Sequence, residues 1–316
     1  MAARLTKNTV AEEAARPRER HPQDDGEFYL MANTAISILF DGVSYAMFLF
    51  IVSVGLSVTM GLMGFVNLAH GAFAMAGGYL VVTATQSWGL PFPLALIIAA
   101  VTIGAISILF ERTLYAGLYG ASELDQVLMT IGLTFMVIAA ITYFYGPLPE
   151  HVRVPDYLTG EINLGFRSFP TYRVFIILIG VVLIAVLYGF ERTSLGAKIR
   201  AAVDNARMAQ SIGIDVARLF RISFALGSGL AALGGGLAIQ LFGLTPSFAI
   251  LYLVFFLLVV AVGGSGTLWD TLIAALVLGI CDTAGKYLYA DAGGFFIYAV
   301  AVAILLIKPA GLYGRG

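Results

Sequence analysis

The sequence predicts an all-α, polytopic membrane protein with eight to nine transmembrane helices, some of them short or broken. Residues 222–269 contain no charged side chain, and between Glu27 and Glu111 only Asp41 is charged. The 316 residues are 59% hydrophobic and 12% charged, whereas soluble proteins are about 25% charged. Because lipid offers no partner to a charge, apolar tracts of this length are typical of helices that cross a bilayer.

Individual spans are predicted from apolar runs separated by turn or charge signals. The expected spans are residues 34–59, 73–87, 94–110, 127–145, 174–190, 220–241, 250–262, 272–288 and 295–307. The second and seventh are short for a full crossing of about 20 residues, and each follows glycine- or proline-containing sequence. Transporters use such interrupted spans beside a substrate path, and two ordinary short helices are an equal alternative.

The first 30 residues differ in composition from the rest. Five basic residues alternate there with six acidic ones. Such a polar segment cannot bury enough apolar surface to fold alone, so residues 1–30 are expected to be a disordered tail and residues 31–316 the transmembrane domain. Cleavage as a secretory signal is not expected, because acidic residues precede the first apolar run.

Residues 191–221 form a charged island between apolar runs, and such an island must lie in water. The island has six basic residues, whereas residues 146–172 have only Arg153 and Arg167. Because short cytosolic loops are rich in Lys and Arg, the island is predicted to be cytosolic, with residues 146–172 outside and the carboxyl end inside. The side of the amino end depends on whether residues 34–68 cross once or twice. The basic residues of the tail favour the cytosol, which would require two crossings or a re-entrant piece, and the sequence leaves this open.

Within the island a short helix is predicted from Asn205 to Ile212. Asp204 is expected to cap its start, and Gly213 suits the left-handed residue that ends a helix. Asp215 can cap the next helix, which leads back into the membrane. The island is therefore expected to be one short helix between two turns.

Eight residues do not sustain a helix in water, so another surface must cover this one. Met208, Ala209 and Ile212 offer a small apolar face. Arg200 and Arg207 offer charge to a partner. A docking protein and a layer of lipid headgroups would both accept these residues, and their spacing does not distinguish the two.

Three segments of the chain are similar to motifs of one known family. The run GLMGFVNLAHGAF at residues 61–73, followed by GGY at 77–79, resembles the signature near the start of the permease subunits of branched-chain amino-acid ABC importers. The island, with RTSLG at 192–196 and AQSIGI at 209–214, resembles their cytosolic loop, and KPAGLYG at 308–314 resembles their closing motif. The match is to the shorter, H-type subunit.

The resemblance implies the ABC importer permease fold in a cell's inner membrane. The implied partners are an M-type second permease subunit, two cytosolic ATPase subunits and a periplasmic or external solute-binding protein, in addition to membrane lipid. Residues 191–221 would be the coupling loop, whose helix sits in a groove of the ATPase and transmits its closure. The residues implied in coupling are Asp204, Asn205, Arg207, Met208, Ala209, Ile212 and Gly213.

An enzyme is not expected from these residues. Residues 279–287 come nearest to a phosphate-binding loop, but Gly285-Lys286 is one residue late and Tyr287 replaces the required Ser or Thr. No metal site is expected, because the three histidines are scattered, and neither a cofactor nor a nucleic-acid partner is expected. ATP hydrolysis is expected on a partner subunit.

Polar residues inside the spans are the candidates for the substrate path. Asn67 and His70 are three apart at the irregular entry to a span, and Gln240 lies at the outer end of another. For Asn67 and His70 a structural role is favoured, because amides and imidazoles are natural partners of freed backbone groups. Asp282 and Lys286, four apart, are expected to pair on one helix face.

A ridge of small residues recurs at every fourth position in the span 220–241. Such a ridge allows close approach of helix backbones, either within this subunit or at an interface with another, and the two are equally favoured. The ridge consists of Ser223, Gly227, Ala231 and Gly235.

The expected solute is a branched-chain amino acid. Two departures from the family pattern leave urea, short amides or an aromatic acid as alternatives: Ala72 replaces an often acidic residue, and Leu268-Trp269-Asp270 replaces a small, proline-bearing turn. A stand-alone secondary transporter or channel is the alternative of another class. It would bury a coupling charge in mid-span, which the long charge-free tracts disfavour.

Overall fold

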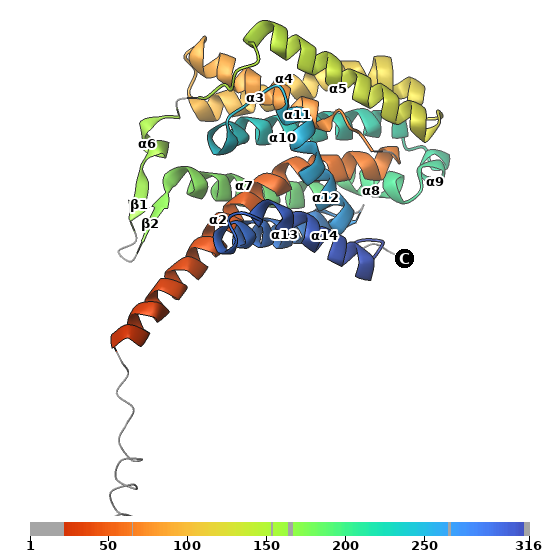
Figure 1. Ribbon diagram of the computed structural model, residues 1–316. Helices are drawn as coiled ribbons and strands as arrows, with labels where there is room; N and C mark the ends of the chain where they lie inside the picture. Colours follow the sequence, from red (N-terminus) through yellow and green to blue (C-terminus); the bar gives the residue numbers. More distant parts are fainter. Residues whose placement is uncertain (1–21, 65, 153, 164–166, 265–266, 313–316) are drawn as a thin grey trace, which may run out of the picture.

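The computed structural model of the protein describes residues 22–64, 66–152, 154–163, 167–264 and 267–312. Helices dominate the described chain, and the elements follow one another as shown in Figure 1. The elements before the island are α2 (Pro22–Met63), α3 (His70–Gln86), α4 (Phe92–Phe110), η1 (Glu111–Tyr115), η2 (Ala116–Leu118), α5 (Glu123–Tyr145), α6 (Asp156–Thr159), β1 (Glu161–Asn163), β2 (Ser168–Pro170) and α7 (Thr171–Glu191). The remaining elements are α8 (Ser194–Asp204), α9 (Ala206–Ser211), α10 (Val216–Phe242), α11 (Phe248–Leu251), α12 (Leu253–Gly263), α13 (Leu268–Leu288), η3 (Gly293–Phe295) and α14 (Phe296–Ile307).

Six helical segments of the described chain are long and apolar enough to cross a membrane. They belong to α2, α4 with its η1 and η2 extension, α5, α7, α10 and α13. Two further apolar segments are shorter, α11–α12 and η3–α14, and α3 has 17 residues. Every span expected from the sequence coincides with one of these segments, so the prediction of an all-α, polytopic membrane protein is confirmed.

The second and seventh expected spans, residues 73–87 and 250–262, adjoin breaks in the helical backbone. Residues 66–69 between α2 and α3 are not helical, and Gly64 ends α2 with a φ of 74°, in the left-handed region that glycine adopts without strain. Helix α11 is only four residues long and continues into α12 after Tyr252. Irregular backbone at these places leaves polar groups that other parts of the chain must satisfy.

Two opposite ends of the helix bundle are distinct in Figure 1. One end has the amino-terminal part of α2, α6 and the antiparallel β1–β2 hairpin, in which Ile162 pairs with Phe169. There the Arg167 guanidinium donates to the Asn33 carbonyl at 2.9 Å. The other end has α8, α9 and the carboxyl terminus, where the Leu312 N–H donates to the Val262 carbonyl at 2.7 Å.

Helix α2 is continuous over 42 residues, which decides the path of the amino-terminal region. Residues 34–63 therefore pass once from the hairpin end to the island end, which answers the question of one or two crossings that the sequence left open. The helix already begins at Pro22, inside the segment expected to be disordered, because each residue added to an existing helix gains one hydrogen bond. Residues 1–21 of the expected tail lie outside the described residues.

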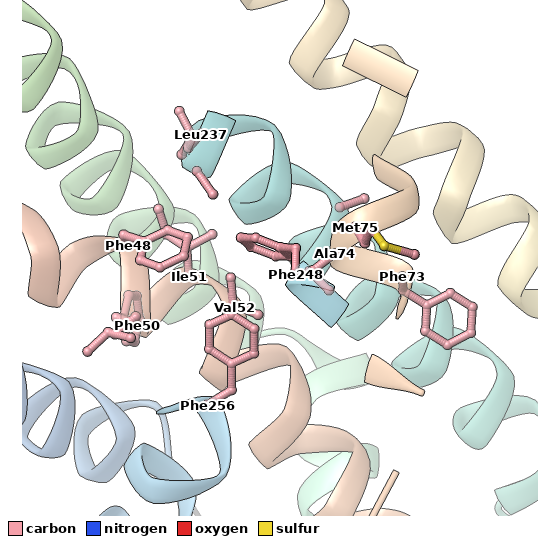
Figure 2. Packing of buried hydrophobic residues seen from close by; sticks show 14 of the residues in the cluster. Phe48, Phe50, Ile51, Val52, Phe73, Ala74, Met75, Leu237, Phe248 and Phe256 are labelled. Atoms are coloured by element: carbon pink, nitrogen blue, oxygen red, sulfur yellow. The ribbon is translucent and has the colours of Figure 1, made fainter. Parts of the chain in front are cut away.

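The core surrounds α10, which packs on α2, α3 and α4, while α13 packs along α2. Figure 2 shows Phe48 and Val52 of α2 facing Phe248 and Phe256, with Met75 of α3 on the opposite side. In contrast, α5 and α7 keep most of their apolar surface exposed, and Met136 and Phe144 are 71% and 77% exposed. Such outward apolar faces are typical of helices that contact lipid or another membrane subunit.

Candidate functional site

The island consists of two helices, α8 and α9, and not of the single short helix expected. Thr193 caps α8 by accepting a hydrogen bond from the Gly196 N–H at 3.2 Å. The Arg200 guanidinium donates to the Glu191 carbonyl, which fastens α8 to the end of α7. Helix α8 was not predicted from the sequence, because this helix lacks the long apolar face by which membrane spans are recognised.

Helix α9 is capped at both ends by the residues around it. The side chain of Asn205 accepts from the Met208 N–H at 2.9 Å, so Asn205 is the N-cap, and the expectation for Asp204 is wrong. Asp204 is instead the last residue of α8. Asn and Asp are about equally good N-caps, and Asn205 is the cap because its backbone is extended, as an N-cap requires. Gly213 has a φ of 86°, the left-handed end that was predicted.

The following helix, α10, is also capped as predicted. Asp215 Oδ1 accepts a hydrogen bond from the Arg218 N–H at 2.9 Å. The Ile214 N–H donates to the Ala209 carbonyl at 3.0 Å and closes the end of α9. The island therefore has a defined backbone at each of its turns.

One side of α9 is buried within this subunit. Ala209 is 2% exposed and belongs to an apolar cluster with Ile199 of α8, Leu219 of α10 and Leu62 of α2. The surface that a six-residue helix needs is thus supplied in part by the chain itself. Through this cluster, α9 and α8 rest on the end of α2 and on the first turn of α10.

The other side of α9 is exposed. Met208 and Ile212 are 62% and 72% exposed, and Arg207 beside them is exposed too. The apolar face expected from Met208, Ala209 and Ile212 is therefore divided, with only Ala209 turned inward. Two large apolar side chains and a guanidinium therefore lie together on the outer surface of the island.

A cavity of about 820 Å³ separates the island from the membrane helices. Its walls come from α2, α7, α8 and α10, together with residues near the start of α13. Glu191, Arg200, Asp204 and Asp270 line it, so it is polar where it meets the island. Ser223 of α10 also lines it, and among the described residues its hydroxyl has no hydrogen-bond partner.

Asn67 and His70 are both fully buried at the break between α2 and α3. Asn67 Oδ1 accepts from the Ala69 N–H at 3.1 Å and from the Tyr115 hydroxyl at 2.9 Å. His70 Nε2 bonds the Val52 carbonyl at 2.9 Å. These contacts fit the structural role that was favoured for the pair.

Tyr115 of η1 was not singled out in the sequence, because a tyrosine in an apolar run has no distinguishing spacing. Gln240 is exposed in the last turn of α10 and does not share the buried site of Asn67 and His70. The three candidates for the substrate path are therefore not brought together.

The small-residue ridge of α10 packs against helices of this same subunit. A Cβ at Gly227 would lie 2.7 Å from the Gly55 carbonyl oxygen of α2. A Cβ at Gly235 would overlap the Ala74 carbonyl of α3. Ser223 and Ala231 are buried as well. Of the two equal alternatives, these contacts favour packing inside the subunit.

At the island end, Glu111 is 2% exposed and accepts a hydrogen bond from the Tyr119 hydroxyl at 2.7 Å. Burial, together with this carboxylate, raises the pKa of Tyr119, so the phenol stays protonated and remains a donor. The ring of Tyr119 also packs on Phe220 of α10, with centroids 4.9 Å apart. These contacts fasten η1 and η2 to the start of α10.

The sequence matches the profile of one protein family over most of its length. The family is described as "Branched-chain amino acid transport system / permease component", and it matches residues 38–305. Permease LivH of Escherichia coli strain K12, of a high-affinity branched-chain amino acid transport system, is 25% identical over 88% of this chain and 94% of LivH. Permease BraD of Pseudomonas aeruginosa is 24% identical over 92% and 97%. A probable LivH of Methanocaldococcus jannaschii is 27% identical over 88% and 92%.

These matches agree with the motifs at residues 61–79, 192–214 and 308–314 and with the helical, multi-span fold. The chain belongs to the family of branched-chain amino acid transport permeases, and it is a multi-pass membrane permease of the ABC transporter class.

Proposed function

We propose that this chain is the permease subunit of an ATP-driven importer and forms the membrane path for a branched-chain amino acid. The solute comes from the family description and from the names of the relatives. A small neutral or zwitterionic solute also suits spans that are poor in charge. Its partners are a second, M-type permease subunit, two cytosolic ATPases and an external solute-binding protein that delivers the solute.

One observation supports the coupling role above all: α9 is buried on one side and exposed on the other. Ala209 packs into the cluster that includes Leu62 of α2, while Met208 and Ile212 are free to enter a groove of the ATPase. A force on the exposed side therefore reaches the ends of α2 and α10 through side chains already in contact. The proposed coupling residues are those named above from 204 to 213.

ATP binding can drive the permease only through contacts that differ between two states. The cavity between the island and the membrane helices provides space for such a change. When the ATPases close, movement of α8 toward α10 would narrow this cavity. When the ATPases open again, the cavity would regain its volume. ATP itself binds on the partner subunit, so this chain performs the transport step without an enzymatic step.

The proposed orientation places the island and the carboxyl end in the cytosol of a cell with the permease in its inner membrane. The excess of basic residues in the island supports this assignment. Because α2 passes only once, the hairpin end and the amino-terminal part of α2 then lie outside the cytosol. The hairpin end is also where a solute-binding protein would dock.

Reconstitution tests the proposal most directly. The chain is co-expressed with its M-type and ATPase partners and placed in proteoliposomes, with the loaded binding protein outside and ATP inside. We expect uptake of radiolabelled leucine that requires ATP and is abolished by an inactive ATPase partner. Competition by urea, a short amide or phenylalanine decides the solute class. Uptake by this chain alone without ATP would establish a secondary transporter or channel instead.

A further inference from the structure

A second, smaller pocket of about 220 Å³ lies between α2, α7, α10 and α13, toward the hairpin end. Its lining includes Asp41 and Tyr45 of α2, Arg173 of α7, and Asp282 and Lys286 of α13. Arg173 is the third residue of α7, which begins directly after strand β2, and its carbonyl accepts from the Ser44 hydroxyl at 3.4 Å. In the proposed orientation, this pocket is on the side from which the solute arrives.

The pocket brings together two acids and two bases from three helices. Arg173 forms an ion pair with Asp41, and the Tyr287 hydroxyl donates to Asp41 Oδ2 at 2.5 Å. Lys286 Nζ lies 2.5 Å from Asp282 Oδ2. The formal charges of these four groups cancel, so the pocket matches a solute that is neutral overall and has one charge of each sign.

Of the four charged groups, the Asp282 carboxylate is the most deeply buried, and the two basic side chains lie nearer to solvent. Asp282 is 1% exposed, whereas the side chains of Lys286 and Arg173 are 51% and 37% exposed. Among the described residues, Asp282 Oδ1 accepts no hydrogen bond. A buried carboxylate oxygen without a donor is costly, and a ligand with an N–H donor would remove that cost.

The rest of the lining is suited to an apolar group. Leu241 and Phe242 of α10 form part of the wall, and the Tyr45 ring lies 5.2 Å from Lys286 Nζ. A volume of about 220 Å³ is the share of about seven water molecules in the liquid. This volume is below the roughly 300–1,000 Å³ of pockets that bury drug-sized ligands, so the pocket suits a smaller ligand such as a small amino acid.

We propose that this pocket binds the head group of a zwitterionic α-amino acid as it enters the permease. The ammonium donates to Asp282 Oδ1, and the carboxylate accepts from the outward cations Lys286 and Arg173. The side chain of the solute rests on Leu241 and Phe242. This inference depends on the proposed import of an amino acid and adds the first contact that the permease makes with it.

A purely structural charge network is the rival explanation. Such a network would fasten α2, α7 and α13 by the same two ion pairs. It gives no reason for the open volume between the pairs, nor for the unmatched oxygen of Asp282. The two explanations differ in whether free amino acid competes for these groups.

Binding of tritiated leucine to the purified importer in nanodiscs, without the binding protein, tests the pocket. We expect saturable binding that leucinamide and 4-methylpentanoate displace at least about tenfold less well than leucine, because each lacks one of the two charges. Asp282→Asn and Lys286→Met should each weaken binding about tenfold. Asp291→Asn, an exposed acid on the same side that does not line the pocket, should leave binding unchanged.

Co-purification with the ATPases and basal ATP hydrolysis establish that each variant is assembled. If Asp282→Asn fails to assemble, the half-exposed Lys286→Met variant decides the matter. If the wild type imports leucine but an assembled variant keeps the wild-type leucine binding and the wild-type KM for uptake, the proposed pocket is wrong. The proposed import function is then unaffected. A wild-type importer that does not carry leucine overturns the proposed solute, and the amino-acid pocket with it.

Discussion

Gly55 of α2 and Gly227 of α10 are in backbone contact. A Cβ at Gly55 would lie 2.5 Å from the Gly227 carbonyl oxygen, and a Cβ at Gly227 would lie 2.7 Å from that of Gly55. Helices in lipid have no hydrophobic drive to associate, so close packing of this kind is a main source of their affinity. The contact also joins α2 and α10, two of the helices that line the larger cavity.

Gly227→Ala should therefore destabilise the permease, although alanine favours a helix over glycine by about 1 kcal/mol. The added methyl group must push α2 and α10 apart, at a cost of about 1–3 kcal/mol. Thermal unfolding of the purified importer in detergent measures the effect. Gly132→Ala on α5, where a Cβ meets nothing within 4 Å, is the matched control and should be neutral or slightly stabilising. Equal stability of the two variants would contradict the contact.

Met208→Asp and Ile212→Asp should uncouple ATP hydrolysis from uptake. Each places a charge on the exposed side of α9 without entering the buried cluster. We expect normal insertion, strongly reduced uptake and loss of ATPase stimulation by the loaded binding protein. Ser194→Asp, which adds the same charge at the exposed first turn of α8, should behave as the wild type. Uptake at the wild-type level in both α9 variants would remove α9 from the coupling surface.

Ala209→Asp should act differently from the changes at its exposed neighbours. Ala209 is buried against Ile199 and Leu219, so a carboxylate there would lack a partner and cost several kcal/mol. We expect lower yield and faster proteolysis of the island, in addition to lost uptake. Ala209→Gly removes only one methyl group and should keep most activity. An Ala209→Asp variant that resists proteolysis as well as the wild type would show that this side of α9 is not buried.

Asn67→Ala should lower stability and leave the KM for solute unchanged. The substitution removes the acceptor of the Ala69 N–H and an acceptor of the Tyr115 hydroxyl, at about 1–3 kcal/mol. Tyr115→Phe removes one of these bonds and should cost less, about 1 kcal/mol. Unfolding temperature and uptake kinetics are measured together. A raised KM at unchanged stability would instead place Asn67 on the substrate path.

Cysteine labelling from outside the cell tests the orientation. Cys281, the only cysteine, is replaced by Ala, and single cysteines are placed at Tyr157 or Ser211, both of which are exposed. An impermeant maleimide should label position 157 in intact cells and position 211 only after the membrane is opened. The reverse pattern would invert the proposed topology.

Much of the architecture follows from the sequence because lipid excludes charge and unpaired backbone. The expected spans coincide with helices for this reason, and local chemistry fixed the turns at Gly213 and Asp215. The N-cap of α9 was misplaced by one residue, because Asp204 and Asn205 are chemically equivalent there and only the backbone angle separates them. Helix α8 was missed since its polar composition resembles that of a loop.

The faces of the helices were decided only by the tertiary structure. Spacing puts Met208, Ala209 and Ile212 together, yet packing buries Ala209 alone. The pairing of Gly227 with Gly55 could not be read from the ridge, because lipid and protein interior are equally apolar and the pattern does not say which of them a face meets. The sequence by itself determined that the chain spans a membrane and where its apolar spans lie. Which helices touch, and which polar groups meet across them, follows from contacts between segments far apart in the chain.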